Sequence, residues 1–353
     1  MKAVLFSFTR RGARLSISIQ SYLKLCGWQV RALTGKKFVS LDSQLEEIEP
    51  DLASCTGQAF SGAELLVFIG ASGIAVRSIA PYIKSKTTDP AVLVIDEKGQ
   101  YVIPLLSGHI GGANQMTRKL AGYLHGQPVI TTATDVNHLF AVDEWAARNH
   151  MVISSMREAK AFSAGLLDGG PVGVYSDFPV EGTLPEGLEM QPSGPLGMAI
   201  TLSQDCYPFA ETVVLRPRII HLGIGCRKDT LEEAISRLVL RELRRLRIGL
   251  NLVADIATID IKKQEKGLLH FARNNAIPIQ FYSAGQLNAA PAPGLGFASS
   301  RFVQKTTGTD NVCERAAVLA SRGGRLLLHK TVRDGVTLAI ACEEFCVNFE
   351  MME

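Results

Sequence analysis

The stretch Leu65-Leu-Val-Phe-Ile-Gly-Ala-Ser-Gly73 carries the main signal for the fold. Its first five residues are all apolar, which is typical of a strand buried on both faces of a parallel sheet. Segments with strand-like and helix-like patterns alternate around it, from Val4 to Thr132. Because such alternation builds a largely parallel sheet with helices on both faces, we expect a three-layer α/β/α domain over residues 1–134.

Three local signals refine this N-terminal domain. Residues 92–104 look like two strands joined by the turn Asp96-Glu-Lys-Gly99, which predicts a hairpin. Ser43 and Glu46 have the spacing of a capping box, which predicts a helix running from there toward Ala59. Residues 129–132 read as the last strand of the domain.

Two further regions follow along the chain. Residues 135–217 are expected to form a small middle α+β domain, with helices at 142–150 and 156–167 and then loops and short strands rich in proline and glycine. Residues 218–353 return to alternation and predict a second three-layer α/β/α domain. There, a strand is expected at 219–222, followed by a glycine loop. Thr230 is expected to cap a long helix, with the Leu231 side chain facing the core. Residues 325–331 and 336–341 are expected to pair as the last strands.

Composition excludes several classes of protein. The 353 residues are 46% hydrophobic and 20% charged, which is typical of a folded chain of two or three domains. A net charge of +3 argues against a dedicated nucleic-acid binder. No apolar run approaches the ~20 residues of a membrane span, and the first strand is too short for a signal segment. The seven scattered cysteines are expected to be reduced thiols in a cytoplasm, and their spacing predicts no metal site.

Three loops rich in glycine and hydroxyl groups form the densest candidate site. They are Gly70–Gly73, Pro104–Asn114 and Thr131–Asp135. Loops beyond the carboxyl ends of the strands form the binding crevice of a doubly wound sheet, so we expect the three to meet there. Helix N-termini in such loops bind carboxylates or phosphates. The alternative is that these glycines only permit tight turns between strands and helices.

His109 is the histidine that lies inside one of these loops, and histidine is the simplest general base near neutral pH. Asp135 and Asp143 are candidate partners or bases, although Asp135 could equally cap a turn and Asp143 a helix. His109 could equally serve loop packing. Ser72 and Ser107 lie outside any Gly-x-Ser-x-Gly elbow, so the sequence does not favour covalent serine catalysis.

The C-terminal domain offers a weaker candidate in Gly223-Ile-Gly225-Cys-Arg-Lys228, which follows a predicted strand. Lys228 stands where a dinucleotide-binding loop would have its third glycine, so a nucleotide-dependent enzyme is a rival rather than the favoured interpretation. Asp260 is read as a helix cap, and Lys262 could meet an anionic ligand. The run of arginines between 241 and 247 is typical of a solvated helix face.

Together these segments resemble the cobalt-precorrin-5A hydrolase family (CbiG) of the anaerobic cobalamin pathway. The N-terminal motifs that carry the resemblance are Gly70–Pro81, Lys86–Val92, Ile103–Asn114, Thr131–Asp135 and Ala141–Trp145. The C-terminal motifs are similar to the family's last domain, which CobE-like proteins share, and comprise Leu222–Arg227, Ile259–Leu268 and Val312–Ala317. Cys313 and Arg315 depart from the small and acidic residues expected there.

The resemblance implies a hydrolase that opens the δ-lactone of cobalt-precorrin-5A and releases C20 with its methyl group as acetaldehyde, giving cobalt-precorrin-5B. It implies no cofactor, because cobalt arrives inside the tetrapyrrole-derived substrate. Neighbouring pathway enzymes are further candidate partners, whereas nucleic acid and membrane are not expected. The rival is a non-catalytic carrier of the corrinoid intermediate.

On this view His109 with Asp135 activates water, and backbone N–H groups around Ser107 stabilise the oxyanion. Arg77, Lys86, Arg118, Lys262 and Lys305 are candidate partners for the substrate's carboxylates. The full set expected to bind substrate comprises Ser72, Gly73, Arg77, Gly108, Gly111, Gly112, Asn114, Thr132, Thr134, Gly223, Gly225, Lys262 and Lys305.

Overall fold

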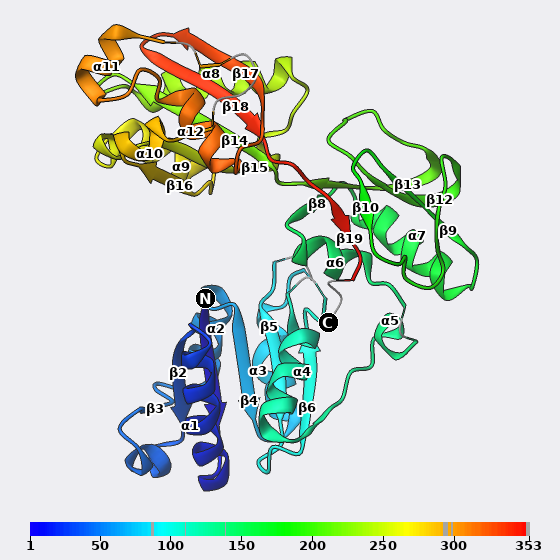
Figure 1. Ribbon diagram of the computed structural model, residues 1–353. Helices are drawn as coiled ribbons and strands as arrows, with labels where there is room; N and C mark the ends of the chain where they lie inside the picture. Colours follow the sequence, from blue (N-terminus) through cyan, green and yellow to red (C-terminus); the bar gives the residue numbers. More distant parts are fainter. Residues whose placement is uncertain (86–87, 110, 138, 292–295, 298, 351–353) are drawn as a thin grey trace. The chain divides into compact units, whose positions relative to one another are not determined.

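The computed structural model describes residues 1–85, 88–109, 111–137, 139–291, 296–297 and 299–350 (Figure 1). Lys86 lies outside the described residues. The chain divides into two compact units, Met1–Trp145 and Ala146–Glu353. Each unit is described by itself below.

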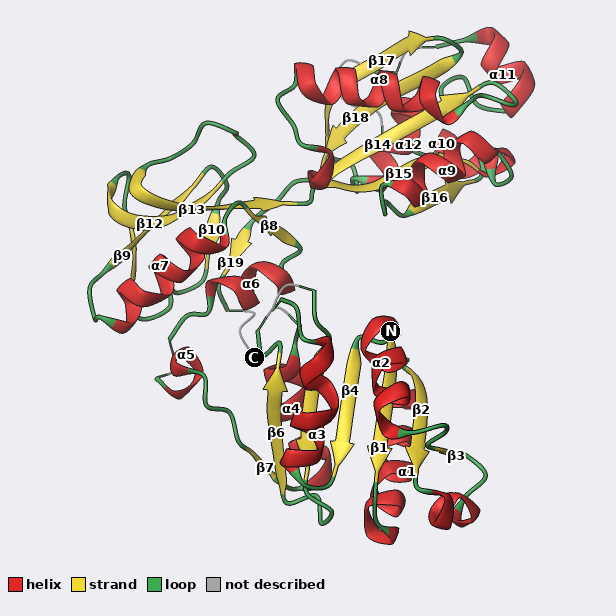
Figure 2. Cartoon of the chain, turned by 180° about the vertical axis from the view of Figure 1, so that it is seen from behind, coloured by secondary structure: helices red, strands yellow, loops and turns green. Residues whose placement is uncertain are grey.

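A seven-stranded sheet forms the centre of the first unit, in the order β3-β2-β1-β4-β5-β6-β7 (Figure 2). The strands are β1 (Lys2–Ser7), β2 (Gln29–Thr34), β3 (Leu45–Glu47), β4 (Leu65–Ile69), β5 (Ala91–Ile95), β6 (Tyr101–Leu106) and β7 (Gln127–Pro128). Strands β1 to β5 are parallel to one another, and β6 pairs antiparallel with β5. The predicted hairpin is therefore confirmed.

Helices cover both faces of this sheet. They are α1 (Arg10–Leu25), α2 (Leu52–Gly62), α3 (Ser72–Ile79) and α4 (Ala113–Leu124). The unit also contains the short helix α5 (Ala133–Val136), the 3-10 turns η1 (Lys36–Leu41) and η2 (Ala80–Tyr82), and the start of α6 (Val142–Arg148), which extends past the end of the unit at Trp145. Apolar side chains of α1 and α4 pack with Leu5 and Val67 on one face. Those of α2 and α3 pack with Phe6 and Phe68 on the other. All five residues of β4 are buried, which confirms the three-layer prediction.

Two predictions in this unit are wrong. Leu45 does not begin a helix: it is buried in β3, where it pairs with Ala32 of β2. Pro50 interrupts the predicted helix, and α2 begins after it, with the Asp51 side chain accepting a hydrogen bond from the Ser54 N–H at 2.8 Å. The last strand, β7, is two residues long and precedes the predicted 129–132.

The second unit begins with a five-stranded sheet in the order β11-β9-β12-β13-β8. Its strands are β8 (Met151–Ile153), β9 (Val172–Ser176), β11 (Leu188–Met190), β12 (Gly194–Ile200) and β13 (Phe209–Pro217), and α7 (Met156–Leu167) packs against them. Only β8 is antiparallel to its neighbour. The glycine- and proline-rich stretch thus forms a regular sheet with more strand than its composition predicted.

The second sheet of this unit has the order β16-β15-β14-β18-β17, and helices cover both of its faces. Its strands are β14 (Ile220–Cys226), β15 (Val253–Ile259), β16 (Ile279–Tyr282), β17 (Arg325–Arg333) and β18 (Val336–Cys342). Its helices are α8 (Glu232–Arg245), α9 (Lys266–Asn274), α10 (Ala284–Asn288), α11 (Arg301–Thr307) and α12 (Cys313–Ala320), with turns η3 (Leu250–Leu252) and η4 (Asp260–Lys262). Strands β10 (Val180–Glu181) and β19 (Val347–Asn348) pair in parallel as a separate two-stranded sheet, which joins the end of the described chain to the segment between β9 and β11.

The predicted pairing of the last two strands, β17 and β18, is confirmed. The predicted cap of α8 is wrong, because the Thr230 hydroxyl donates to the Arg227 carbonyl instead, and Leu231 is 71% exposed rather than inward. Among the described residues, no helix combines the length and the apolar character that crossing a membrane requires.

Candidate active site

The direction of β6 separates the three candidate loops. The Gly70–Gly73 loop follows β4 at the carboxyl edge of the parallel strands. Because β6 is antiparallel, its last residue, Leu106, pairs with Val92 near the start of β5. The loop after β6 therefore lies at the opposite edge, where the Ser107 hydroxyl donates to the Asp89 carbonyl just before β5, at 2.9 Å. The expectation that all three loops meet is wrong.

The second and third loops do come together, around the carboxylate of Asp135. Asn114 Nδ2 donates to Asp135 Oδ2 at 2.8 Å, and the Arg118 guanidinium donates to Asp135 Oδ1. His109 Nε2 lies 3.0 Å from Asp135 Oδ2. Asn114 and Arg118 are one turn apart on α4, so one helix face presents both to the carboxylate.

Two threonines of the third loop also join this group. The Asn114 amide donates to the Thr132 hydroxyl at 3.2 Å, and the Thr134 hydroxyl lies 3.4 Å from His109 Nε2. Sequence analysis placed both threonines in the candidate site, and the structure puts them beside Asp135.

Tight backbone geometry explains the glycines around His109. A Cβ on Gly111 would lie 2.4 Å from the Ser107 Cβ, and one on Gly108 would lie 2.8 Å from Asn114 Oδ1. Gly112 precedes α4 with a φ of 79°, a conformation that favours glycine. These three glycines therefore serve the loop conformation that positions His109.

The backbone N–H groups at the start of α4 are engaged within the loop. Those of Gly112, Ala113 and Asn114 donate to the carbonyls of His109, Ser107 and Gly108, respectively. Ser107 itself is buried, and its hydroxyl is directed at Asp89. Ser107 therefore helps to shape this loop, and its predicted part in catalysis stays a prediction.

The carboxylate of Asp143 contacts the second nitrogen of the His109 ring. His109 Nδ1 lies 3.2 Å from Asp143 Oδ1, in the first turn of α6. Hydrogen bonds to Asp135 and then to Asp143 raise the pKa of His109 to about 10, against the opposing effect of burial. Burial alone would raise the pKa of Asp135, but hydrogen bonds from His109 and Arg118 hold it below its usual value. At neutral pH the cluster therefore contains an imidazolium between two carboxylates.

Glu144 belongs to the same cluster and was missed by the sequence analysis. One ligand atom from each of His109, Asp135 and Glu144 lies within 4.8 Å of the other two. The signal that could have found it is the acidic pair Asp143-Glu144 at the start of a predicted helix. All of these residues lie within the first compact unit.

The other predicted N-terminal binding residues lie away from this cluster. Ser72 and Gly73 are exposed in the first turn of α3, beyond the carboxyl end of β4. Arg77 is also exposed, and its guanidinium donates back to the Gly73 carbonyl at 3.2 Å.

The predicted C-terminal glycine loop is wrong, because Gly223 and Gly225 lie inside β14. A Cβ on Gly223 would lie 1.8 Å from the Cys313 carbonyl oxygen, so this glycine permits α12 to pack closely on the strand. Lys262 forms an ion pair with Glu265 at 3.0 Å, and Lys305 is exposed on α11. All four of these residues lie in the second unit, whereas His109 lies in the first.

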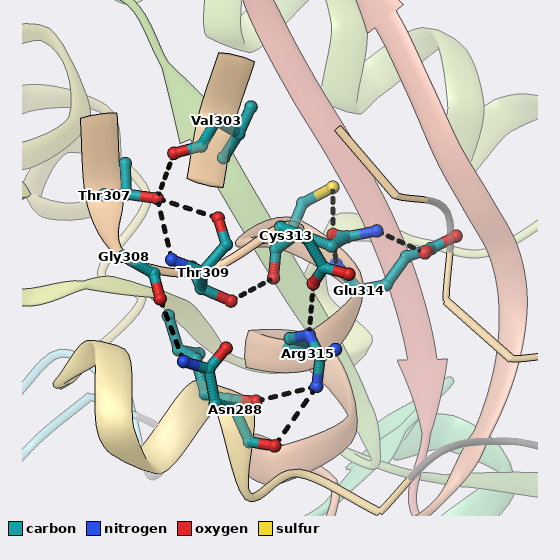
Figure 3. A network of polar contacts seen from close by, with 11 residues as sticks. Asn288, Val303, Thr307, Gly308, Thr309, Cys313, Glu314 and Arg315 are labelled. Carbon is teal, nitrogen blue, oxygen red and sulfur yellow. Dashed lines mark hydrogen bonds and ion pairs between the residues drawn. The ribbon is translucent and has the colours of Figure 1, made fainter. Parts of the chain in front are cut away.

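Arg315, one of the departures from the family pattern, anchors the loops around α12 (Figure 3). Its Nε donates to Asp310 Oδ1 at 2.9 Å, and its NH1 group donates to the Leu287 and Asn288 carbonyls. The neighbouring Glu314 is fully buried and accepts hydrogen bonds from Asn311 and from the Lys330 N–H. This network connects helices of one domain and serves its structure.

Comparisons with known proteins agree along most of the chain. Family models described as cobalamin synthesis G N-terminal, cobalamin biosynthesis central region and cobalamin synthesis G C-terminus match residues 54–135, 140–217 and 220–341. The cobalt-precorrin-5A hydrolase of Salmonella typhimurium is 35% identical over 95% of this chain and 96% of its own length. That of Priestia megaterium is 33% identical over 80% of this chain and 79% of its own. A crystal structure of a cobalamin biosynthesis protein G homolog from Sulfolobus solfataricus covers 97% of both chains at 24% identity, with a TM-score of 0.43.

Proposed function

Because the chain belongs to the cobalamin synthesis G family and is a hydrolase of cobalamin biosynthesis, we propose that it opens the δ-lactone of cobalt-precorrin-5A. Water adds to the lactone carbonyl, and the ring C–O bond breaks to give a carboxylate and a hydroxyl on C20. That hydroxyl then loses its proton as the C–C bond to the macrocycle breaks. The electron pair passes into the conjugated ring, C20 leaves with its methyl group as acetaldehyde, and cobalt-precorrin-5B remains.

The observation that supports this proposal is the cluster of His109, Asp135, Asp143, Glu144 and Arg118. It combines proton acceptors with fixed positive charge, which are the two requirements for adding water to a carbonyl. The side chain of Arg118 is 45% exposed while it holds Asp135, so its guanidinium is accessible to a carboxylate of the substrate.

The protonation state of His109 changes the mechanism that the sequence led us to expect. A ring that donates to two carboxylates is already protonated and accepts no further proton at neutral pH. We therefore assign the proton-accepting role to the α6 carboxylates of Asp143 or Glu144. The His109 imidazolium then positions Asp135 and Asp143 and stabilises negative charge that develops beside it.

The decisive experiment is to measure acetaldehyde release from enzymatically prepared cobalt-precorrin-5A by the purified protein. We expect many turnovers per protein molecule. Tight binding of the corrinoid with no acetaldehyde would contradict the proposal and favour the carrier.

The site assignment is tested by His109→Ala, with His270→Ala as its control. His270 is exposed on α9 and lies in the other unit. We expect His109→Ala to slow turnover by about 100-fold or more, as is typical when a residue of an acid–base cluster is lost, and the control to match the wild type. Near-wild-type turnover by His109→Ala would remove this cluster from the mechanism.

A further inference from the structure

One edge of the first sheet in the second unit has no strand partner along part of its length. Strand β8 pairs with β13 only at residues 215–217, and Ser154 forms two hydrogen bonds with Val214 before the chain turns into α7. Within the part of the chain that the structure describes, no other strand joins β13 on this side, because β8 is the outermost strand of the sheet. The edge of β13 is therefore open over residues 210–212.

The backbone groups of every second residue face this open edge. The Leu215 carbonyl accepts a hydrogen bond from the Thr201 N–H on the β12 side, whereas the Val214 carbonyl accepts one on the β8 side. Because successive residues of a strand direct their backbone groups to opposite neighbours, those of Thr212 and Ala210 face the open edge, as those of Val214 face β8. Unpaired N–H and C=O groups in a row are a template on which an extended peptide adds as a further strand.

A cavity of about 600 Å³ lies beside the open edge, between β13 and the start of α7. The helix contributes Glu158 and Ala161 to its lining, and the strand contributes Phe209, Ala210 and Glu211. A strand added to this edge would direct every second side chain to the face of the sheet that α7 covers. The cavity therefore offers room for the side chains that main-chain pairing would bring in.

Charge selects the kind of peptide that this cavity accepts. One oxygen of Glu158, Oε2, is inaccessible to solvent and has no hydrogen-bond partner among the residues that the structure describes. Its other carboxylate oxygen lies 3.1 Å from the Arg157 guanidinium, whose side chain is 90% exposed. Glu211 adds a second, exposed carboxylate to the same lining. Since a buried acceptor without a donor is unfavourable, a lysine or arginine of the incoming peptide would supply the hydrogen bond that Glu158 lacks.

A second copy of this chain fits the edge less well. Pairing two β13 edges about a twofold axis would bring Glu211 against its own copy, and like charges directly opposite each other on paired strands are destabilising. A positively charged segment of a different protein meets no such repulsion.

We propose that the open edge of β13 is a docking site for an extended segment of a partner protein. The segment adds as a strand beside residues 210–212 and places a lysine or arginine in the cavity against Glu158. This interaction is independent of the proposed reaction, because the docking site lies in the second unit and His109 lies in the first.

The test uses the full-length protein and a synthetic hexapeptide in which valine and lysine alternate, with binding measured by calorimetry. We expect one peptide to bind per protein molecule. Two control peptides separate the contributions of charge and backbone. Replacing lysine by glutamate should abolish binding, and N-methylation of the peptide's backbone amides should abolish it too, because strand addition needs their N–H groups.

Three variants locate the site. Ala210→Pro removes an N–H that faces the open edge, where proline is tolerated, and should lose peptide binding. Glu158→Gln should weaken binding about tenfold or more, because it removes the charge from the hydrogen bond to lysine. Glu189→Gln is the matched control, since Glu189 is exposed on β11 at the opposite edge of the same sheet, and it should bind as the wild type does.

The proposal is overturned if the wild type does not bind the lysine peptide, or if the N-methylated peptide binds as tightly as the unmodified one. Undiminished binding by folded Glu158→Gln would also overturn it. Dimers of the wild type that Ala210→Pro abolishes, in a protein that binds no peptide, would overturn it in favour of a second copy of this chain.

Discussion

At the scale of single residues, His109 shows how neighbours decide the chemistry of a side chain. Its sequence context predicted a base near neutrality, whereas contacts with Asp135 and Asp143 favour the protonated ring. Both partners lie more than twenty residues further along the chain. No local pattern could therefore have indicated that two carboxylates would converge on one imidazole.

The contacts with Asp135 and Asp143 give a prediction for the protonation of His109 in the folded protein. The pKa of His109 should lie near 10, well above the ordinary value of about 6.5, because both ring N–H groups donate to carboxylates. Since the folded-state pKa is the higher one, the contacts contribute fully to stability below about pH 6.5. That contribution should decline as the pH rises from there and be lost through pH 10.

The measurement is an NMR titration of protein carrying ring-labelled histidine, with the His109 signal assigned from His109→Ala. Urea unfolding at pH 6, 8 and 10 then compares the free energy of unfolding of the wild type and this variant. The difference between them should shrink as the pH rises. A His109 pKa close to 6.5 would show that the ring is not held by the two carboxylates in solution.

The sequence indicated some residues of the candidate site and missed others. His109, Asp135, Asn114 and Thr132 could be predicted because loops rich in glycine and hydroxyl groups stand out in the sequence. Arg118 was named only as a candidate cation, and Glu144 was missed. Their positions depend on which face of α4 and α6 turns toward the loop, which is decided by packing rather than by local pattern.

At the scale of elements, strand direction explains the main error in the predicted site. The alternation of apolar segments predicted the sheet and its layers, because burial leaves a periodic pattern in the sequence. The turn Asp96–Gly99 correctly predicted the hairpin. A hairpin also moves the next loop to the other edge of the sheet, so the Gly70–Gly73 loop and the His109 loop lie at opposite edges.

The contact between β14 and α12 gives a second prediction. Gly223→Ala should destabilise the protein by about 3 kcal/mol, the upper part of the usual range for overpacking. The new Cβ would lie 1.8 Å from the Cys313 carbonyl oxygen, a backbone atom that cannot move without shifting α12. The measurement is the free energy of urea unfolding, followed by circular dichroism.

Gly285→Ala is the control in the same unit. Gly285 is exposed in α10, and a Cβ there has its nearest neighbour 3.9 Å away. Because alanine favours helix more than glycine does, this change should leave stability unchanged or raise it by up to about 1 kcal/mol. Equal effects of the two substitutions would mean that α12 does not approach β14 as closely as the structure shows.

At the scale of the whole molecule, the three predicted domains map onto two compact units. The second unit contains two five-stranded sheets and the two-stranded pair of β10 and β19, which joins the end of the described chain to the segment that follows β9. Strand β19 pairs with β10, and the Val347 N–H donates to the Pro179 carbonyl at 2.9 Å. Phe345 packs edge-on against Phe178, with ring centroids 5.1 Å apart. A two-residue strand at the end of a chain carries almost no periodic signal, so the sequence could not predict this connection.

The division into units predicts that they unfold as separate transitions. Both tryptophans, Trp28 and Trp145, lie in the first unit, so tryptophan fluorescence follows that unit while far-ultraviolet circular dichroism follows both. Gly223→Ala acts in the second unit. It should therefore lower the midpoint of a circular-dichroism transition by several degrees and leave the fluorescence midpoint of thermal unfolding unchanged. If the fluorescence midpoint falls as far as the circular-dichroism midpoint, the two units unfold as one cooperative system, and a packing defect beside α12 would then also destabilise the His109 cluster.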